Sequence, residues 1–363
     1  MLTFDRNPAR AIDARGNQLG QKLPFPVTTF DSNGGTKTYD STGAFLVGEL
    51  ERLDMTLHEP LAVVTWGRDI DLREDVTIAD EVSSFTTTTY GSAGGLGTGN
   101  AIGTGKAWIG KNTSQISGVG VDIAKTAQDL RLWGLEIRYT IPELESAARL
   151  GRPIDQQKYA ALQLKYQMDV DEQVYIGDAA FSDNAITGGL VNKSNVTPQN
   201  IVAGASGFTQ WAQKSPDEIL ADINNALITN WANAAWAVMP DRILIPPAQY
   251  GQLCTQKVSL AGNVSVLKYV LENNLLTTSR GGKLEIYPLK WCIGAGQGGT
   301  IGTVGHDRMV VYRKDKDKIR FPMTLLQRTP VQYDGIYHKT TYFGRLGVLE
   351  LVYPQILGFY DGV

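Results

Sequence analysis

A glycine-rich tract inside a β-prone segment is the feature that most limits what this chain can fold into. The run 83–90 is rich in threonine and aromatic residues, which favour extended strands. Glycine then recurs through residues 91–110, and apolar residues alternate at Leu135, Ile137 and Tyr139, which predicts a half-buried strand. A loop of this size without its own core is usually functional or disordered. We therefore predict a long hairpin-like excursion that gains its order from a partner.

The overall charge argues against a dedicated reader of nucleic-acid sequence. The 363-residue chain has a formal net charge of −3 and a sequence pI of about 5.7. Proteins that read DNA usually present a basic face, and no block of lysine and arginine occurs here. Any contact with DNA is therefore expected to be weak and independent of base sequence.

The sequence gives no sign of secretion, of a membrane span or of a disulfide framework. Charged residues near the N-terminus are not followed by an apolar signal core. No uncharged apolar run approaches the ~18 residues that cross a bilayer, so we predict a soluble protein. Two cysteines, Cys254 and Cys292, are too few for a disulfide scaffold. Cys292 lies in an apolar context that predicts a buried thiol in a strand.

A long helix is predicted in the middle of the chain, after a short helix over residues 142–149. It begins with Asp155 as N-cap and ends near Gly177. Five residues recur on one face and predict a continuous packing stripe: Tyr159, Leu162, Tyr166, Val170 and Val174.

Alternating helices and strands follow over residues 215–300. Ser215 and Glu218 form a capping box at the start of a helix, and the run 242–245 is a predicted strand. Residues 308–363 return to a β pattern, interrupted by a lysine–aspartate turn at 314–318 that we expect to be solvated. Near the N-terminus, the apolar run 60–66 also predicts a strand.

The motifs that carry chemistry elsewhere are absent or incomplete. Gly99, Gly105 and Lys106 resemble a phosphate-binding loop, but the spacing is one residue too long and Ala107 replaces the required serine or threonine. Asp169, Asp171 and Glu172 cluster on the long helix, where adjacent positions point in different directions and salt bridges are the simpler role.

The three histidines show no metal-site or catalytic spacing. His58, His306 and His338 are far apart in the sequence, and no cysteine neighbours one at a zinc-site spacing. We therefore predict no catalytic residue, no metal and no cofactor.

The order of these elements resembles the major capsid proteins of HK97-type tailed bacteriophages, especially a subgroup similar to encapsulins. The likeness is clearest around the long helix, in a pattern of small and apolar residues. The residues that carry it are Leu130 to Tyr139, Glu143-Leu144, Ala147, Gly151, Asp155, Gly177 and Gly189-Leu190-Val191-Asn192.

The resemblance implies an α+β chain with the HK97-like capsid fold. Its expected parts are an N-terminal arm (1–45), the start of the P-domain (46–74), an extended β-hairpin E-loop (75–128), the P-domain with its spine helix at about 155–177 (129–199), an α/β A-domain (200–305) and C-terminal P-domain strands (306–363). A fused scaffolding domain is not expected before so short an arm.

The implied function is a non-enzymatic major capsid protein, located in the virion and assembled in the host cytoplasm. Hexamers and pentamers of the chain would form an icosahedral shell around double-stranded DNA, joined by portal and cement or decoration proteins and by no membrane. We expect Trp108, Ile109, Lys106 and Lys111 near the loop tip to contact a neighbouring subunit. Some family members cross-link through a loop lysine, but no matching acceptor asparagine or catalytic glutamate is identified here.

Two alternatives remain open at this point. An encapsulin-like compartment would enclose a protein cargo instead of DNA. A soluble α/β hydrolase built on the 200–305 segment would place one of the three histidines in a polar pocket, beside an acid or a cysteine.

Overall fold

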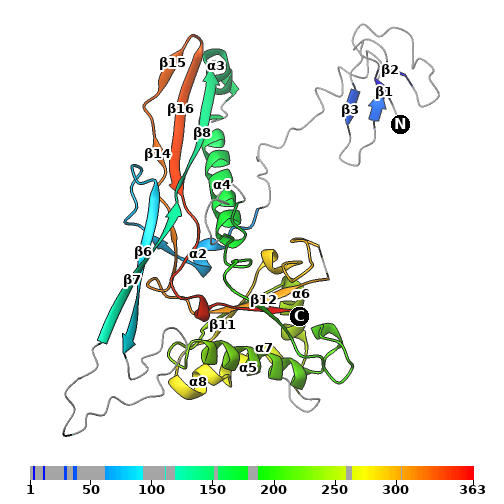
Figure 1. The fold of residues 1–363 in the computed structure, drawn as a ribbon. Helices are drawn as coiled ribbons and strands as arrows, with labels where there is room; N and C mark the ends of the chain where they lie inside the picture. Colours follow the sequence, from blue (N-terminus) through cyan, green and yellow to red (C-terminus); the bar gives the residue numbers. More distant parts are fainter. Residues whose placement is uncertain are drawn as a thin grey trace. The chain divides into compact units, whose positions relative to one another are not determined.

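The computed structural model divides the chain into two units, residues 1–61 and 62–363. In the first, it describes two short antiparallel pairs: β1 (Thr3–Phe4) with β2 (Ala11–Ile12), and β3 (Thr28–Phe30) with β4 (Thr36–Thr38). In the second, it describes residues 62–92, 111, 119–150, 154–178, 187–258, 264–303 and 305–363 (Figure 1). The glycine tract and most of the predicted N-terminal arm lie outside the described residues.

A five-stranded sheet forms the centre of the second unit. Its order is β11 (Glu285–Pro288), β10 (Arg242–Ile245), β12 (Arg308–Tyr312), β18 (Gly358–Asp361) and β9 (Pro198–Asn200). The outer pairs are parallel and the inner pairs antiparallel. Because β12 and β18 belong to the C-terminal segment, the sheet runs across the domain boundary predicted at residue 305.

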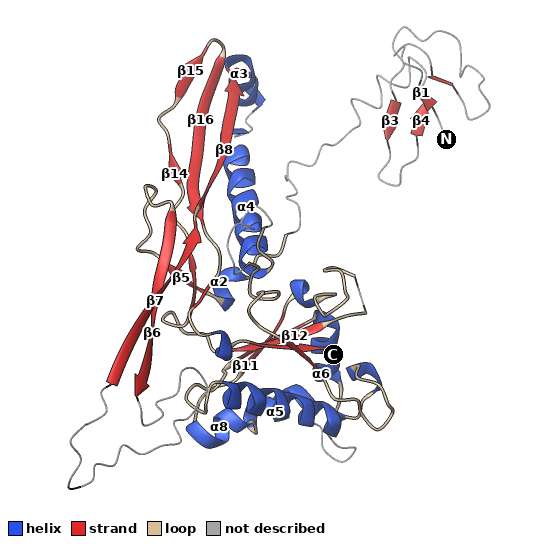
Figure 2. Cartoon of the chain, viewed as in Figure 1, coloured by secondary structure: helices blue, strands red, loops and turns tan. Residues whose placement is uncertain are grey.

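Both faces of this sheet are buried, because its side chains alternate between two apolar cores. Ile243 and Ile245 pack with the helices α5 (Pro216–Asn233), α6 (Pro247–Thr255), α7 (Val266–Glu272) and α8 (Leu275–Arg280). Leu244 points to the second core, which contains the long helix α4 (Ile154–Tyr175). Figure 2 shows α5 and α8 lying along one face of the sheet. The predicted capping box of α5 is confirmed at Ser215 and Glu218.

A second, elongated sheet lies along α4. Strand β16 (Tyr337–Leu346) pairs along its whole length with β8 (Arg131–Thr140), and its other edge pairs with β14 (Gln327–Arg328) and β15 (Gln332–Asp334). The short helix α3 (Ile141–Leu150) follows β8 directly. The predicted N-cap of α4 is wrong, because Asp155 already lies inside the helix.

A two-stranded hairpin leaves the body between these sheets. It consists of β6 (Val82–Ser92) and β7 (Val119–Asp129), paired residue by residue from Val82 with Asp129 to Ser92 with Val119. Its base adjoins a small sheet of β17 (Glu350–Leu351), β13 (Ile319–Pro322) and β5 (Asp71–Arg73). The β-prone run 83–90 is therefore confirmed as part of β6 and is paired with β7, whereas the alternating run with Leu135, Ile137 and Tyr139 forms β8 and pairs with β16.

Two local predictions are wrong for an identifiable reason. The run 60–66 was predicted as a strand, but residues 62–65 have no regular structure and Trp66 begins the helix α2 (Trp66–Asp69). The Asp171 carboxylate accepts hydrogen bonds from the amides of Thr65 and Trp66, at 2.8 and 3.0 Å, and so takes donors that a strand partner would need. Cys292 lies in the 3-10 helix Lys290–Cys292 instead of a strand, although it is fully buried as predicted.

Candidate assembly surfaces

The distal half of the hairpin presents an apolar stripe to solvent. Every residue from Val119 to Lys125 is exposed, and the alternating residues Val119, Val121 and Ile123 are 64, 57 and 65% exposed. Residues two apart on a strand point to the same side. Tyr90, which pairs with Val121, is also exposed. We call Tyr90, Val119, Val121 and Ile123 the hairpin stripe. A two-stranded ribbon is at best marginally stable alone, so this one needs a covering surface.

The base of the hairpin, in contrast, is held by a buried carboxylate. Glu350 is completely buried and forms ion pairs with Arg73 at 2.9 Å and with Arg320 at 2.7 Å. The Ser83 hydroxyl of β6 donates a hydrogen bond to the same carboxylate. Arg73 also donates to the carbonyl of Ser84, at 3.1 Å. The hairpin is therefore fixed at its base by charge, while Val119, Val121 and Ile123 in its distal half stay exposed.

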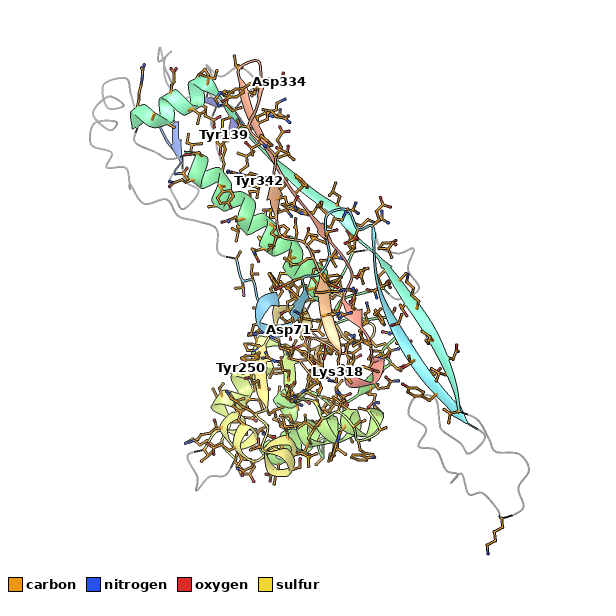
Figure 3. All side chains as sticks on the ribbon, turned by 90° about the vertical axis from the view of Figure 1, so that its left-hand side faces the viewer. Asp71, Tyr139, Tyr250, Lys318, Asp334 and Tyr342 are labelled. Carbon is orange, nitrogen blue, oxygen red and sulfur yellow. The ribbon has the colours of Figure 1, made fainter. Side chains whose placement is uncertain are left out.

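A groove of about 1100 Å³ runs beside α4. Tyr139 and Tyr342, on neighbouring strands, line it together with Tyr159 of the helix (Figure 3). The rings of Tyr159 and Tyr342 lie 5.5 Å apart, and the exposed Leu325 lies at the same groove. An aromatic groove of this kind can receive an apolar segment of another chain.

The predicted stripe on α4 divides between the core and this groove. Leu162, Tyr166, Val170 and Val174 are buried, and burial raises the pKa of Tyr166 to about 12. Tyr159, the first residue of the stripe, is partly exposed in the groove wall. Tyr166 also packs edge-on against Trp133 of β8 with 4.8 Å between ring centroids, which joins the helix to the elongated sheet.

The distal end of the elongated sheet carries further exposed apolar residues. Val331, Tyr333 and Ile336 surround the β15–β16 turn, and Tyr333 is 72% exposed. Gly335 adopts a φ of +62° in this turn, a conformation that favours glycine. Large exposed apolar patches usually mark interaction sites.

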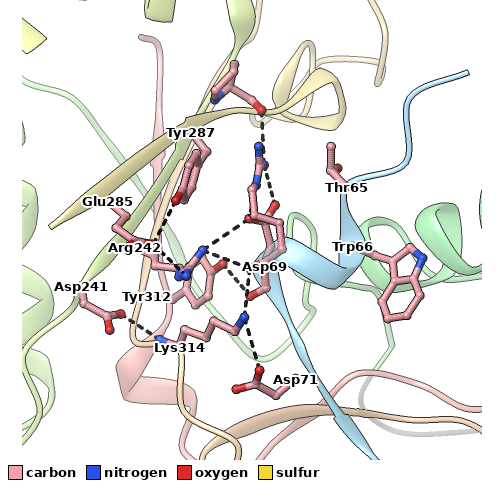
Figure 4. A network of polar contacts seen from close by, with 12 residues as sticks. Thr65, Trp66, Asp69, Asp71, Asp241, Arg242, Glu285, Tyr287, Tyr312 and Lys314 are labelled. Carbon is pink, nitrogen blue, oxygen red and sulfur yellow. Dashed lines mark hydrogen bonds and ion pairs between the residues drawn. The ribbon is translucent and has the colours of Figure 1, made fainter. Parts of the chain in front are cut away.

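A buried polar network connects α2 and β5 to the five-stranded sheet (Figure 4). Asp69 is fully buried and forms two hydrogen bonds with the Arg68 guanidinium, at 2.7 and 2.8 Å. The hydroxyl groups of Tyr175 and Tyr312 donate to the Asp69 carboxylate and carbonyl respectively. Burial, together with the Asp69 charge, raises the pKa of both tyrosines. They therefore remain protonated hydrogen-bond donors.

Further charges on the sheet complete this network. Arg242 and Lys314 both donate to the carbonyl of Arg68, at 3.0 and 2.9 Å. Arg242 also pairs with Glu285 at 2.8 Å, and Lys314 with Asp71 at 3.3 Å. Every one of these charged groups has an opposite partner, so the network is structural. The solvated turn predicted over 314–318 is wrong for Lys314, which is half-buried here, whereas Lys316 and Asp317 are exposed.

Several of the residues considered for chemistry make structural contacts or are buried. Asp171 accepts from the Trp291 indole at 2.8 Å, and Asp169 from the Trp133 indole at 2.9 Å. Burial raises the pKa of the Cys292 thiol, which disfavours the reactive thiolate. His306 is exposed, and His338 packs edge-on against Tyr333.

No group of three metal-ligating side chains occurs within the part of the chain that the structure describes. Among the described helices, none is long and apolar enough to cross a membrane.

The residues predicted at the loop tip cannot be placed. Lys106, Trp108 and Ile109 lie outside the described residues, as does His58, while Lys111 is an exposed turn residue. Their role in subunit contact stays a prediction. Sequence reasoning missed Glu350, although a lone glutamate between Val348-Leu349 and Leu351-Val352 is a signal for a buried, paired charge.

Comparison with known proteins identifies the class of this architecture as the HK97-like capsid fold. The capsid of Myoviridae phage XM1 matches with a TM-score of 0.67 and 16% identity, covering 87% of this chain and 98% of that one. The capsid of a native GTA particle matches with a TM-score of 0.51 and 10% identity, covering 89 and 98%. A structure of Mycobacterium phage Ogopogo matches with a TM-score of 0.50 and 11% identity, covering 88 and 98%.

Residues 105–363 match the sequence profile of the major capsid protein family, and the chain belongs to that family. It is therefore a self-assembling structural protein of the virion shell, and not the hydrolase considered as an alternative. A comparison with curated protein sequences gave no match.

Proposed function

We propose that this chain forms the icosahedral head shell of a tailed phage, as hexamers and pentamers that enclose double-stranded DNA. The hairpin stripe carries the proposal, because a row of exposed apolar side chains on an otherwise unsupported ribbon requires a partner surface. Copies of the same chain supply that surface many times over in a closed shell.

The stripe would lie on an adjacent subunit and be covered there. Fully burying a side chain such as valine or isoleucine contributes about 1.5–3 kcal/mol. Each contact is therefore modest, but contacts made together raise the effective concentration of the next one. The N-terminal arm and the tip residues Lys106, Trp108, Ile109 and Lys111 would add to the same overlap.

The remaining partners follow from the same function. The formal net charge of −3 means that any contact with packaged DNA would be weak and independent of base sequence. Portal and decoration proteins would complete the particle, and assembly would take place in the host cytoplasm. The predicted domain scheme, with an E-loop over 75–128 and an A-domain from residue 200, belongs to this proposal.

Deleting residues 95–110 tests the role of the loop. We expect the wild-type protein to form closed shells in electron micrographs and the deleted chain to remain as soluble subunits with unchanged thermal stability. Normal shells from the deleted chain would contradict this role.

The contents of the particles separate the phage shell from the encapsulin-like alternative. Nuclease-protected double-stranded DNA in particles from infected cells supports the phage shell. A stoichiometric enzyme cargo without DNA supports the protein compartment.

A further inference from the structure

One buried lysine lacks the carboxylate partner that such a residue normally needs. Lys193 is 1% exposed, and its Nζ donates to the carbonyls of Leu349 at 2.7 Å and Gly188 at 3.2 Å. Among the described residues, no carboxylate lies within ion-pair distance of it. Burying an unpaired charge is costly, and the usual outcome is that the group becomes neutral.

Lys193 belongs to a turn that closes the end of α4. We call residues 187–194 the capping turn. The amides of its residues 189, 190 and 191 donate to the carbonyls of Ile176, Val174 and Tyr175, at and just beyond the end of α4, at 2.9, 2.8 and 3.0 Å respectively. Gly189 packs so closely that an added Cβ would lie 2.3 Å from the carbonyl carbon of Tyr175. The capping turn therefore cannot shift without releasing the helix end.

The lysine also connects the capping turn to the base of the hairpin. Its acceptor Leu349 precedes Glu350, the carboxylate that holds Ser83, Arg73 and Arg320. The charges that face this region are thus Glu350 on β17, Arg73 on β5 and Arg320 on β13. Arg308 on β12 donates to the carbonyl of Val191 at 2.8 Å but is paired with Asp361.

We propose that Lys193 is a proton-sensitive latch, which holds the capping turn against β17 while its amine is neutral and releases it on protonation. This regulation rests on the proposed function, because the shell contact made by the hairpin depends on its base. Taking up a proton from solvent places a charge among carbonyls that cannot neutralise it.

The working range of the latch extends upward from about pH 7. Burial lowers the pKa of Lys193 to about 7, opposed in part by the Glu350 charge. A lysine whose pKa is lower in the folded than in the unfolded state contributes most stability above its unfolded pKa. That contribution is lost as the pH falls toward the folded value. As the pH falls from the unfolded pKa toward 7, the equilibrium constant for opening should rise by up to about tenfold per pH unit, and below pH 7 it should level off because both states are then protonated.

Hydrogen exchange of purified shells at pH 8 and pH 6, corrected for intrinsic exchange rates, tests the latch. We expect wild-type protection of residues 189–191 to fall about tenfold at pH 6, while β12 is unchanged. Lys193→Met should keep equal protection at both pH values. Lys214→Met is the matched control, because the equally buried Lys214 is paired with Asp222 at 2.6 Å and should not affect the pH response.

If residues 189–191 of the wild-type protein are equally protected at pH 8 and pH 6, the latch is overturned, and no variant is needed for this conclusion. The latch is overturned as well if the protection of Lys193→Met falls between pH 8 and pH 6 by as much as that of the wild type. Electron microscopy of the same samples keeps the two proposals separate, because intact shells with pH-independent protection refute the latch and leave the shell function standing.

Discussion

The five-stranded sheet and the β6–β7 hairpin both contain antiparallel strand pairs, yet they are stabilised in opposite ways. The sheet buries alternate side chains such as Ile243 and Leu244 in two different cores. The hairpin buries only its base, and the stripe from Val119 to Ile123 stays exposed. The sheet is complete within one subunit, whereas under the proposed function the hairpin stripe would be covered by a second subunit.

If a second subunit covers the hairpin stripe, subunit stability and shell stability are carried by separate residues. Substitutions in the sheet should affect unfolding of the isolated chain, and substitutions in the hairpin stripe should affect assembly. The buried Glu350 lies between these cases, because it belongs to the body and fixes the hairpin.

The largest effect on the subunit is expected in the sheet. Leu244→Ala removes a fully buried side chain that packs in the core containing α4. We expect the free energy of unfolding to fall by about 2–5 kcal/mol, measured by chemical denaturation of unassembled protein. A loss no larger than that of an exposed control, Leu325→Ala, would mean that this core is not closed within one subunit.

An intermediate effect is expected at the hairpin base. Glu350→Gln leaves Arg73 and Arg320 without their shared carboxylate, which should cost about 3 kcal/mol and increase hydrogen exchange of residues 82–85. Glu136→Gln provides the control, because its ion pair with Arg138 is exposed and contributes little. If the two substitutions change the free energy of unfolding and the hydrogen exchange of residues 82–85 equally, Glu350 does not anchor the hairpin.

The smallest effect on the subunit, with the largest effect on assembly, is expected in the stripe. Ile123→Ser should change the free energy of unfolding by less than about 0.5 kcal/mol, because the side chain is exposed in the isolated chain. The same change should reduce the yield of shells in sedimentation and electron microscopy. Lys125→Ser, at another exposed position of β7, is the control, and an equal loss of shells from it would assign assembly to the ribbon as a whole.

Local patterns predicted the elements well, because they depend on nearby residues. Threonine-rich β-prone sequence at 83–90, the helical periodicity that contains Tyr166 and Val170, and the capping box at Ser215 all appear in the structure. The run 60–66 failed because its amides are taken by Asp171, more than one hundred residues away. Sequence periodicity carries no information about such a partner.

The polar clusters were beyond prediction for the same reason. Glu350 collects groups from β5, β6 and β13, and Lys193 gains its acceptor from the start of β17. Each residue looks unremarkable beside its sequence neighbours, and only the tertiary fold brings the groups together. The motif Gly189-Leu190-Val191-Asn192, which was used only as a mark of resemblance, has a direct role in closing α4.

The full-length pairing of β8 with β16 also has a mechanical consequence. Its antiparallel register runs without interruption from Tyr337 with Thr140 to Leu346 with Arg131, and α4 lies alongside (Figure 1). Interstrand hydrogen bonds lie across the strand direction, so a pull along the strands loads the whole ladder in shear instead of opening one bond after another. When internal pressure stretches a shell wall along this direction, the tension is therefore shared among many bonds at once.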